Sequence, residues 1–83
     1  MKIIFTERAK KDWQNLNREI QNQIRKKLSF YIRSGNIFRF AQKLKDSSLG
    51  EYRFRIGDHR LIFDFENFTI FVLKVGHRKN IYK

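Results

Sequence analysis

Three arginines, Arg53, Arg55 and Arg60, stand in the stretch GEYRFRIGDHRLIF, residues 50–63. If this stretch forms a β-hairpin that turns at Gly57-Asp58, Arg55 lies directly opposite Arg60, and Arg53 shares their face. Like charges that face each other across a strand pair are unfavourable by a few tenths to about 1 kcal/mol. A bound phosphate would turn this repulsion into charge-assisted hydrogen bonds, because the planar guanidinium fork matches phosphate oxygens. The spacing therefore predicts an anion site on one face of a sheet.

Two acids offer an alternative interpretation of the same face. Glu51 and Asp64 lie opposite each other in this hairpin and could neutralise the arginines as a surface ion-pair cluster. That interpretation does not explain why both acids sit at one end of the face and the arginines at the other.

The overall charge also indicates an anionic partner. The 83 residues contain 19 Lys and Arg against 8 Asp and Glu, a formal net charge of +11. A balance this basic points to a polyanion, which could be RNA, DNA, an anionic membrane face or an acidic protein. A basic surface with no specific partner is the alternative.

The composition also narrows the class of protein. With no Cys and only two His, the chain offers no thiolate site, and we expect neither a metal nor a cofactor. No apolar run is long enough to span a membrane, and the N-terminus lacks the apolar region of a signal peptide, so we expect a cytoplasmic protein. The length and the 41% apolar content predict one domain over residues 1–83.

The elements that position the arginines begin with a short strand over residues 2–5. Thr6 is a plausible helix N-cap, and apolar residues then recur at spacings of three and four, which predicts helices over 7–15 and 18–33. A row of cations falls on the opposite side of the second helix and forms either a solvated face or a docking face for an acidic partner: Arg18, Arg25, Lys26 and Arg33.

The apolar spacing of residues 37–44 predicts one or two further helical turns that end at residues 46–48. The period then changes to two. Tyr52, Phe54, Leu61 and Phe63 should share the core face of the hairpin, and a third strand is predicted over 68–75. The expected fold is α+β, with a small, mainly antiparallel β-sheet packed on one face by an N-terminal helical hairpin. The sheet comprises the short N-terminal strand and a C-terminal three-stranded meander.

The last residues, GHRKNIYK, add cations, an imidazole and a phenol. With the segments KLK, YRFRIGDHRLIF and GHRKNIY, the whole chain resembles the RelE/ParE toxin superfamily, and especially its RelE-like mRNA interferase branch. The resemblance implies a RelE-like fold and a toxin of a type II toxin–antitoxin system that an acidic, RelB-like antitoxin inhibits. It also implies a ribosome-dependent endoribonuclease that cleaves mRNA without a metal.

The resemblance implies roles for individual residues. Arg53, Arg55 and Arg60 correspond to the basic residues of the family's hairpin, and Arg78 and Tyr82 to its C-terminal basic residue and tyrosine. Arg53 and Arg60 would stabilise the transition state, and Arg78 would stabilise or protonate the leaving oxygen. Tyr82 would stack on a base or orient the nucleotide. Further RNA or phosphate contacts are expected from three lysines, Lys43, Lys45 and Lys79.

The sequence departs from the family where relatives often carry lysine, at Arg53 and Arg55. Arginine keeps its proton at ordinary pH, so Arg55 is a poor general base. The candidates for the base are His77, Glu51 and Asp64, unless positioning on the ribosome and charge stabilisation carry most of the rate.

Two other functions remain open. A ParE-like toxin that inhibits DNA gyrase without nuclease activity would share much of the pattern, and a plain nucleic-acid-binding module would share the charge. The antitoxin is expected to lie along the basic helical face and to cover or displace the arginines.

Overall fold

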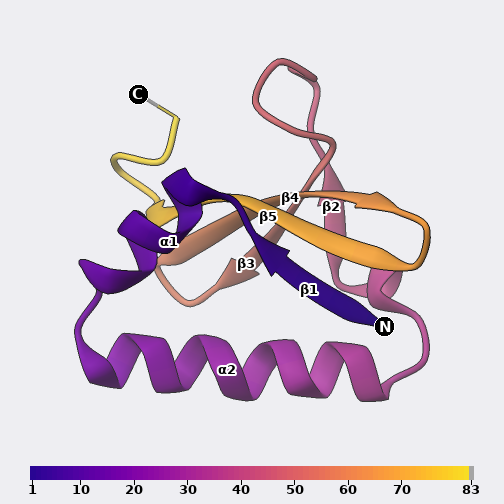
Figure 1. The fold of residues 1–83 in the computed structure, drawn as a ribbon, viewed down its shortest axis with the longest axis horizontal. Helices are drawn as coiled ribbons and strands as arrows, with labels where there is room; N and C mark the ends of the chain where they lie inside the picture. The colour runs from indigo at the N-terminus through magenta and orange to yellow at the C-terminus, as the bar shows by residue number, and fades with distance from the viewer. Residues whose placement is uncertain (83) are drawn as a thin grey trace.

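The computed structural model describes residues 1–82, which form five strands, two α-helices and one 3₁₀ turn (Figure 1). In chain order the elements are β1 (Lys2–Phe5), α1 (Glu7–Gln14), α2 (Arg18–Arg33), η1 (Ile37–Arg39), β2 (Ala41–Lys43), β3 (Tyr52–Ile56), β4 (His59–Glu66) and β5 (Thr69–His77). No helix among these residues is long and apolar enough to cross a membrane.

The strands form one sheet in the order β1-β5-β4-β3-β2. β1 runs parallel to β5, and the other neighbouring strands are antiparallel. The predicted α+β fold is confirmed, including the N-terminal strand and the three-stranded meander. β5 is paired on both sides, which agrees with its apolar character.

The helical turns predicted over residues 37–44 are wrong in their second half. Only Ile37–Arg39 is helical, and Ala41–Lys43 forms a fifth strand, β2, on the free edge of β3. Three residues are too few for a period of two to be visible in the sequence. The apolar spacing arises because Ile37 is buried in the core and Phe40 stacks on Tyr31 with ring centroids 4.5 Å apart.

The two main helices begin at capping side chains. Thr6 accepts the N–H of Ala9 at 3.2 Å, and Asn17 accepts the N–H of Ile20 at 2.9 Å. Such caps satisfy N–H groups that have no partner within the helix. The predicted helices over 7–15 and 18–33 are confirmed, the first one residue shorter at its end.

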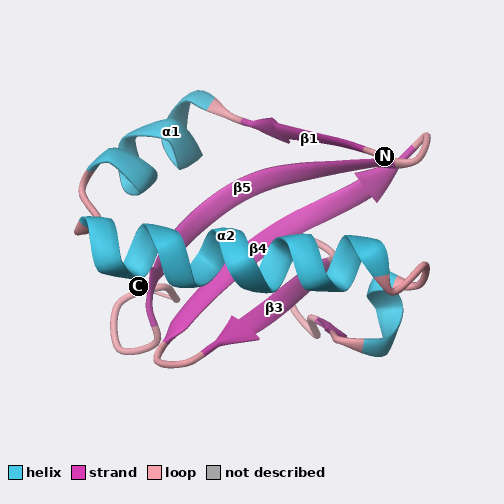
Figure 2. Ribbon diagram, turned by 90° about the horizontal axis from the view of Figure 1, so that it is seen from below, coloured by secondary structure: helices cyan, strands magenta, loops and turns pink. Residues whose placement is uncertain are grey.

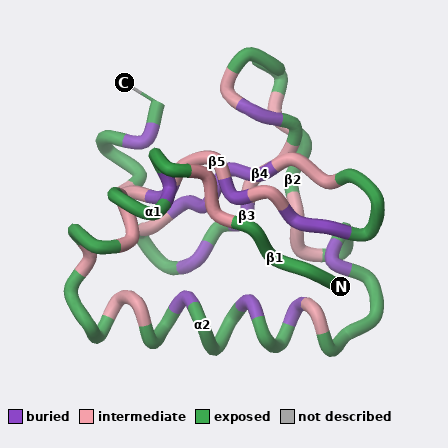
Figure 3. The backbone as a smooth tube through the Cα atoms, in the orientation of Figure 1, coloured by how far each residue is buried: buried purple, intermediate pink, exposed green. Residues whose placement is uncertain are grey.

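α2 crosses one face of the sheet, and its buried positions point toward the strands (Figures 2 and 3). Ile24, Leu28 and Tyr31 of α2 form one core with Phe54, Leu61, Phe63 and other strand residues. Burying each such side chain contributes about 1.5–3 kcal/mol. The core fixes which face of the β3–β4 hairpin meets the helix, and so which face remains for the arginines.

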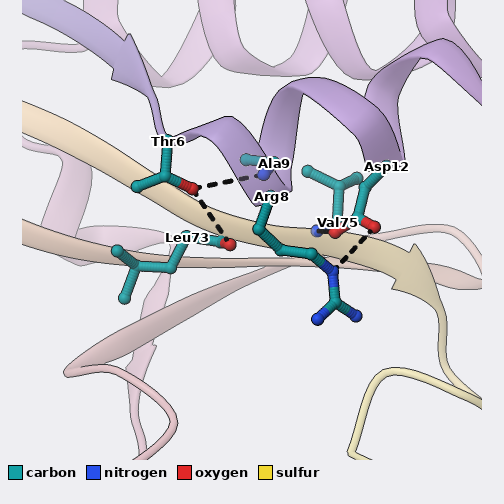
Figure 4. Close-up of polar contacts among 6 residues, drawn as sticks. All are labelled: Thr6, Arg8, Ala9, Asp12, Leu73 and Val75. Atoms are coloured by element: carbon teal, nitrogen blue, oxygen red, sulfur yellow. Dashed lines mark hydrogen bonds and ion pairs between the residues drawn. The ribbon is translucent and has the colours of Figure 1, made fainter.

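α1 packs beside β5, beyond the last residue that pairs with β1, and polar side chains connect α1 to β5 (Figure 4). Asp12 accepts the N–H of Val75 at 3.0 Å and the Nε–H of Arg8 at 3.1 Å. The hydroxyl of Thr6 donates to the Leu73 carbonyl at 3.4 Å. These side chains satisfy backbone groups of β5 that β1 is too short to reach.

The sheet face opposite α2 also buries an apolar side chain of β4. Ile62 is fully buried although it faces away from the helices, and Gly50 lies against it. A Cβ on Gly50 would stand 2.6 Å from Cγ2 of Ile62, so only glycine allows the loop over 44–51 to pack there. Figure 1 shows this loop and the C-terminal segment rising from the same side of the sheet. The arginines occupy that side.

Candidate active site

The strand register places the hairpin arginines as the spacing predicts. Arg55 lies opposite Arg60, and Arg53 lies opposite Ile62. Gly57, at the turn, has a φ of +59°, which suits a two-residue turn with Gly first. The three arginines therefore share the helix-free face of the sheet, on strands that are paired on both sides.

Arg60 is the buried member of this group. It is 7% exposed, and its Nη1 donates to the carbonyl oxygens of Gly57 and His59, both at 2.9 Å. Burial lowers the pKa of Arg60, and the charges of Arg55, Arg53 and Arg78 lower it further, while Tyr82 acts in the opposite direction. Arg60 thus experiences the repulsion of its neighbours, which an incoming anion would relieve.

Arg53 is held at both ends of its guanidinium. Its Nε donates to Oε1 of Gln42 on β2 at 2.8 Å, and its Nη1 donates to the hydroxyl of Tyr82. The guanidinium carbon also lies 5.8 Å from the centroid of the Tyr82 ring. The sequence-predicted residues Arg53 and Tyr82, far apart along the chain, are therefore in direct contact.

The C-terminal segment is attached to the hairpin by backbone bonds and one apolar side chain. The N–H of Arg78 donates to the carbonyl of Asp58 at 2.8 Å, and Ile81 is buried, 2% exposed. The Arg78 guanidinium also lies 3.7 Å from the Asp58 carboxylate, a pair exposed enough to contribute little to stability. These contacts bring Arg78 and Tyr82 to the arginine face, with Tyr82 still 42% exposed.

His77 lies on the other face of the sheet. The register places it opposite His59, two positions beyond the buried Val75, so it shares the face of the core rather than that of Arg60. Its Nδ1 accepts the N–H of Lys79 at 3.1 Å. The structure therefore does not bring the predicted imidazole base together with the arginines.

His59 forms an edge-on ring pair with His77, with centroids 5.4 Å apart. Burial lowers the pKa of His59, the charges of His77 and Arg60 lower it further, and Asp58 opposes the shift. No role for His59 is predicted from the sequence, although His59 directly precedes Arg60 in the hairpin.

The two acids of the hairpin are engaged by backbone groups. Asp64 accepts the N–H of Glu51 at 2.8 Å, and Glu51 accepts the N–H of Phe65 at 3.3 Å. Within residues 1–82 neither acid forms an ion pair with Arg53, Arg55 or Arg60. The ion-pair interpretation of this face is therefore not supported, and the cationic charge of the arginines is left for another partner.

The predicted lysines are divided between the faces. Lys45 lies on the exposed loop over 44–51, and Lys79 is exposed in the C-terminal segment. Lys43 pairs with Tyr52 in the register, so it does not share the face of Arg53; Gln42 does. Because the apolar spacing predicts a helix over residues 37–44, it does not predict the strand alternation of 41–43 or the contact of Gln42 with Arg53.

The basic residues of α2 are all exposed, and two of them border a groove of about 770 Å³ between β1, α1 and α2. Arg25 and Arg33 line this groove; Arg18 and Lys26 do not. The guanidinium of Arg25 lies 5.2 Å from the centroid of the Trp13 ring. The apolar residues that line the groove are Ile3, Phe5, Trp13, Leu28 and Ile32. An apolar groove with a cationic rim suits an acidic, amphipathic segment.

The described residues offer no cluster of three or more His, Asp or Glu side chains that could hold a metal ion. Around Arg60, the helix-free face presents three guanidiniums and the Tyr82 phenol, groups suited to binding and polarising phosphate.

This fold is that of a class of proteins, the RelE/ParE superfamily of toxins from type II toxin–antitoxin systems. Residues 3–82 match the family model described as ParE toxin of type II toxin-antitoxin system, parDE. The chain belongs to this family, and it is a type II toxin. No curated protein matches the sequence closely enough to count as a relative.

Solved structures support the same assignment. A chain of the toxin–antitoxin complex RelBE2 from Mycobacterium tuberculosis is 25% identical with a TM-score of 0.75, and the match covers 93% of this chain and 96% of that one. A chain of the RelB–RelE complex from Methanococcus jannaschii is 25% identical with a TM-score of 0.72, over 95% and 94% of the two chains. A chain of the E. coli RelBE complex, at 24% identity and a TM-score of 0.63 over 92% and 94%, shares the fold.

Proposed function

We propose that this toxin is a ribosome-dependent mRNA endoribonuclease that acts in the cytoplasm. The observation that carries the proposal is the contact between Arg53 and Tyr82 beside the Arg55–Arg60 pair. A guanidinium whose shape suits phosphate, an exposed aromatic ring and arginines without an acidic partner among the described residues thus share one face, which supports the proposal. The solved structures most relevant to the proposal are those of RelE-type toxin–antitoxin complexes.

The reaction needs no cofactor. The 2′-oxygen of the mRNA attacks the adjacent phosphorus and forms a 2′,3′-cyclic phosphate, while the bond from phosphorus to the 5′-oxygen breaks. Arg60 and Arg55 stabilise the negative charge that grows on the phosphoryl oxygens, and Arg53 holds the phosphate next to Tyr82. The exposed ring of Tyr82 stacks on a splayed base.

Proton transfer is the weakest contribution of this chain. Arg78 stabilises the leaving 5′-oxygen, which takes a proton from a solvent water to give a 5′-hydroxyl. The 2′-hydroxyl proton passes to solvent or to a ribosomal group, because His77 faces the other side and the hairpin acids bind backbone N–H groups. The toxin therefore contributes alignment and charge stabilisation, and positioning on the ribosome contributes the rest of the rate.

A second candidate function is supported by the family model, which describes ParE toxins. In this alternative the toxin inhibits DNA gyrase and cleaves no RNA. The arginine face would then bind gyrase or DNA, and the precise contact between Arg53 and Tyr82 would matter little.

One experiment separates the two functions. The toxin is induced in cells, mRNA ends are mapped by primer extension, and plasmid supercoiling and gyrase–DNA cleavage complexes are measured in the same culture. We expect codon-phased mRNA cuts that are lost in Arg53→Ala, are about tenfold weaker in Tyr82→Phe, which loses one hydrogen bond, and are unchanged in the exposed control Lys27→Ala. Intact mRNA together with accumulating gyrase complexes would reject the nuclease.

The proposed partner is an acidic antitoxin of the RelB kind. The solved complexes RelBE2 and RelB–RelE contain an antitoxin by name. Its amphipathic segment would occupy the groove between β1, α1 and α2, with apolar side chains on Trp13 and Leu28 and acids near Arg25 and Arg33. The remainder would cover or displace the arginine face.

A further inference from the structure

We infer that Gln42 is a positioning residue of the arginine face, whose amide orients the Arg53 guanidinium without neutralising its charge. The register of β2 and β3 places Gln42 directly opposite Arg53, and Oε1 of Gln42 accepts the Nε–H of Arg53 at 2.8 Å. Because the guanidinium is planar, fixing Nε also fixes the directions of both Nη groups. One of them, Nη1, then meets the hydroxyl of Tyr82.

Arg53 and Arg60 both donate hydrogen bonds to acceptors that carry no charge. Arg53 donates to an amide and a phenol, and Arg60 donates to two backbone carbonyls. The nearby carboxylates of Glu51 and Asp64 accept backbone N–H groups instead. The face therefore has fixed geometry and undiminished positive charge, which is what a phosphate site requires.

The position of Gln42 argues against a packing role. Gln42 is exposed, and it lies in the middle of a three-residue strand at the edge of the sheet. A carboxylate there would accept the same N–H group from Arg53 but would cancel one charge of the site. The amide thus combines an acceptor with zero charge, and both properties can be tested separately.

The test uses the purified chain and two-dimensional NMR of the arginine Nε–H groups, with inorganic phosphate as the probe. The Arg53 signal is identified by its loss in Arg53→Lys. In the unmodified chain we expect a resolved, slowly exchanging Arg53 signal. In Gln42→Ala this signal should be lost to exchange, and the phosphate Kd should rise about threefold. In Gln42→Glu the signal should persist, while the phosphate Kd rises about fivefold.

The matched control is Gln14→Glu, which makes the same charge change at an exposed position of α1 that borders the groove rather than the arginine face, and it should leave both readouts within twofold. The inference is overturned if the Arg53 signal is unresolved in the unmodified chain. It is equally overturned if that signal survives in Gln42→Ala, or if Gln42→Glu binds phosphate as tightly as Gln14→Glu does.

The inference deepens the proposed function, because it concerns the same phosphate site, but neither readout involves the ribosome. If Gln42 orients Arg53 and mRNA nevertheless stays intact in cells, only the nuclease proposal fails. If mRNA is cleaved and Gln42→Ala changes neither the signal nor the Kd, only the role of Gln42 fails.

Discussion

The carboxylate of Asp12 stands where a strand partner of Val75 would stand: its Oδ2 accepts the Val75 N–H at 3.0 Å, beyond the end of β1 (Figure 4). A side chain from α1 thus completes the hydrogen bonding of β5 near the strand's C-terminal end. The segment that carries Arg78 and Tyr82 leaves the sheet directly after this point. The attachment of α1 and the location of the site are therefore connected through β5.

This relationship predicts the effect of Asp12→Ala on stability. The change leaves the Val75 N–H without a partner and removes the ion pair with Arg8, so we expect the free energy of unfolding to fall by about 1.5–3 kcal/mol. Urea unfolding followed by circular dichroism measures this free energy of unfolding. Glu7→Ala removes an exposed ion pair with Lys10 and serves as the control, with an expected loss below about 1 kcal/mol. Equal losses in the two variants would contradict the role of Asp12.

The pairing of Arg55 with Arg60 predicts a variant that is more stable and less active. Arg55→Gln removes a like-charge pair across β3 and β4, so the free energy of unfolding should rise by a few tenths of a kcal/mol, most clearly at low salt. The same change should reduce mRNA cleavage, because one charge stabiliser is lost. Urea unfolding at two salt concentrations, with Lys27→Gln as an exposed control, checks the first part. A destabilised Arg55→Gln would show that the repulsion is already compensated.

The histidine pair predicts how stability depends on pH. Burial, His77 and Arg60 hold the pKa of His59 below the ordinary histidine value of 6.5, so the unfolded chain binds this proton more readily than the folded chain does. The contribution of neutral His59 is complete above pH 6.5 and is lost as the pH falls through the folded-state pKa. Unfolding measured from pH 8 to pH 5 should show this decline in the unmodified chain and a smaller one in His59→Gln. Identical pH profiles of stability in the two chains would contradict this role of His59.

The groove between β1, α1 and α2 predicts that antitoxin binding distinguishes two arginines of the same helix. Arg33 lines the groove and Arg18 does not, although both are exposed. Arg33→Glu should weaken binding of the acidic antitoxin by about tenfold, and Arg18→Glu should change it much less. Isothermal titration with the cognate antitoxin measures both affinities. If the two reversals have the same effect, long-range charge rather than the groove determines binding.

The hairpin could be predicted from the sequence because local rules determine it. The Gly57-Asp58 turn sets the register, and alternation then assigns Phe54 and Leu61 to the core and Arg53 to the other face. The approach of Tyr82 to Arg53 could only be expected by resemblance, since it depends on how a C-terminal segment packs through Ile81.

Other features depend on contacts that no local pattern reveals. The strand over Ala41–Lys43 exists because the edge of β3 needs a partner, and its apolar spacing imitates a helix. Ile62 is buried on the arginine face because Gly50 covers it. The position of His77 followed from the register of β5 with β4, which contains a bulge between Ile62 and Phe63. Apolar character on both faces of β5 left that register undetermined in the sequence.

The groove lies beside β1, at one edge of the sheet, and the arginines lie on β3 and β4 on the opposite face. Strands about 4.8 Å apart put the outermost arginines roughly 15 Å from that edge, measured across the sheet, and an extended chain needs about five residues to cover this distance. A partner seated in the groove can therefore inhibit the site directly only if it continues around the edge. Antitoxin length, and not affinity alone, becomes a determinant of inhibition: a fragment that fills only the groove should bind the toxin and leave it active.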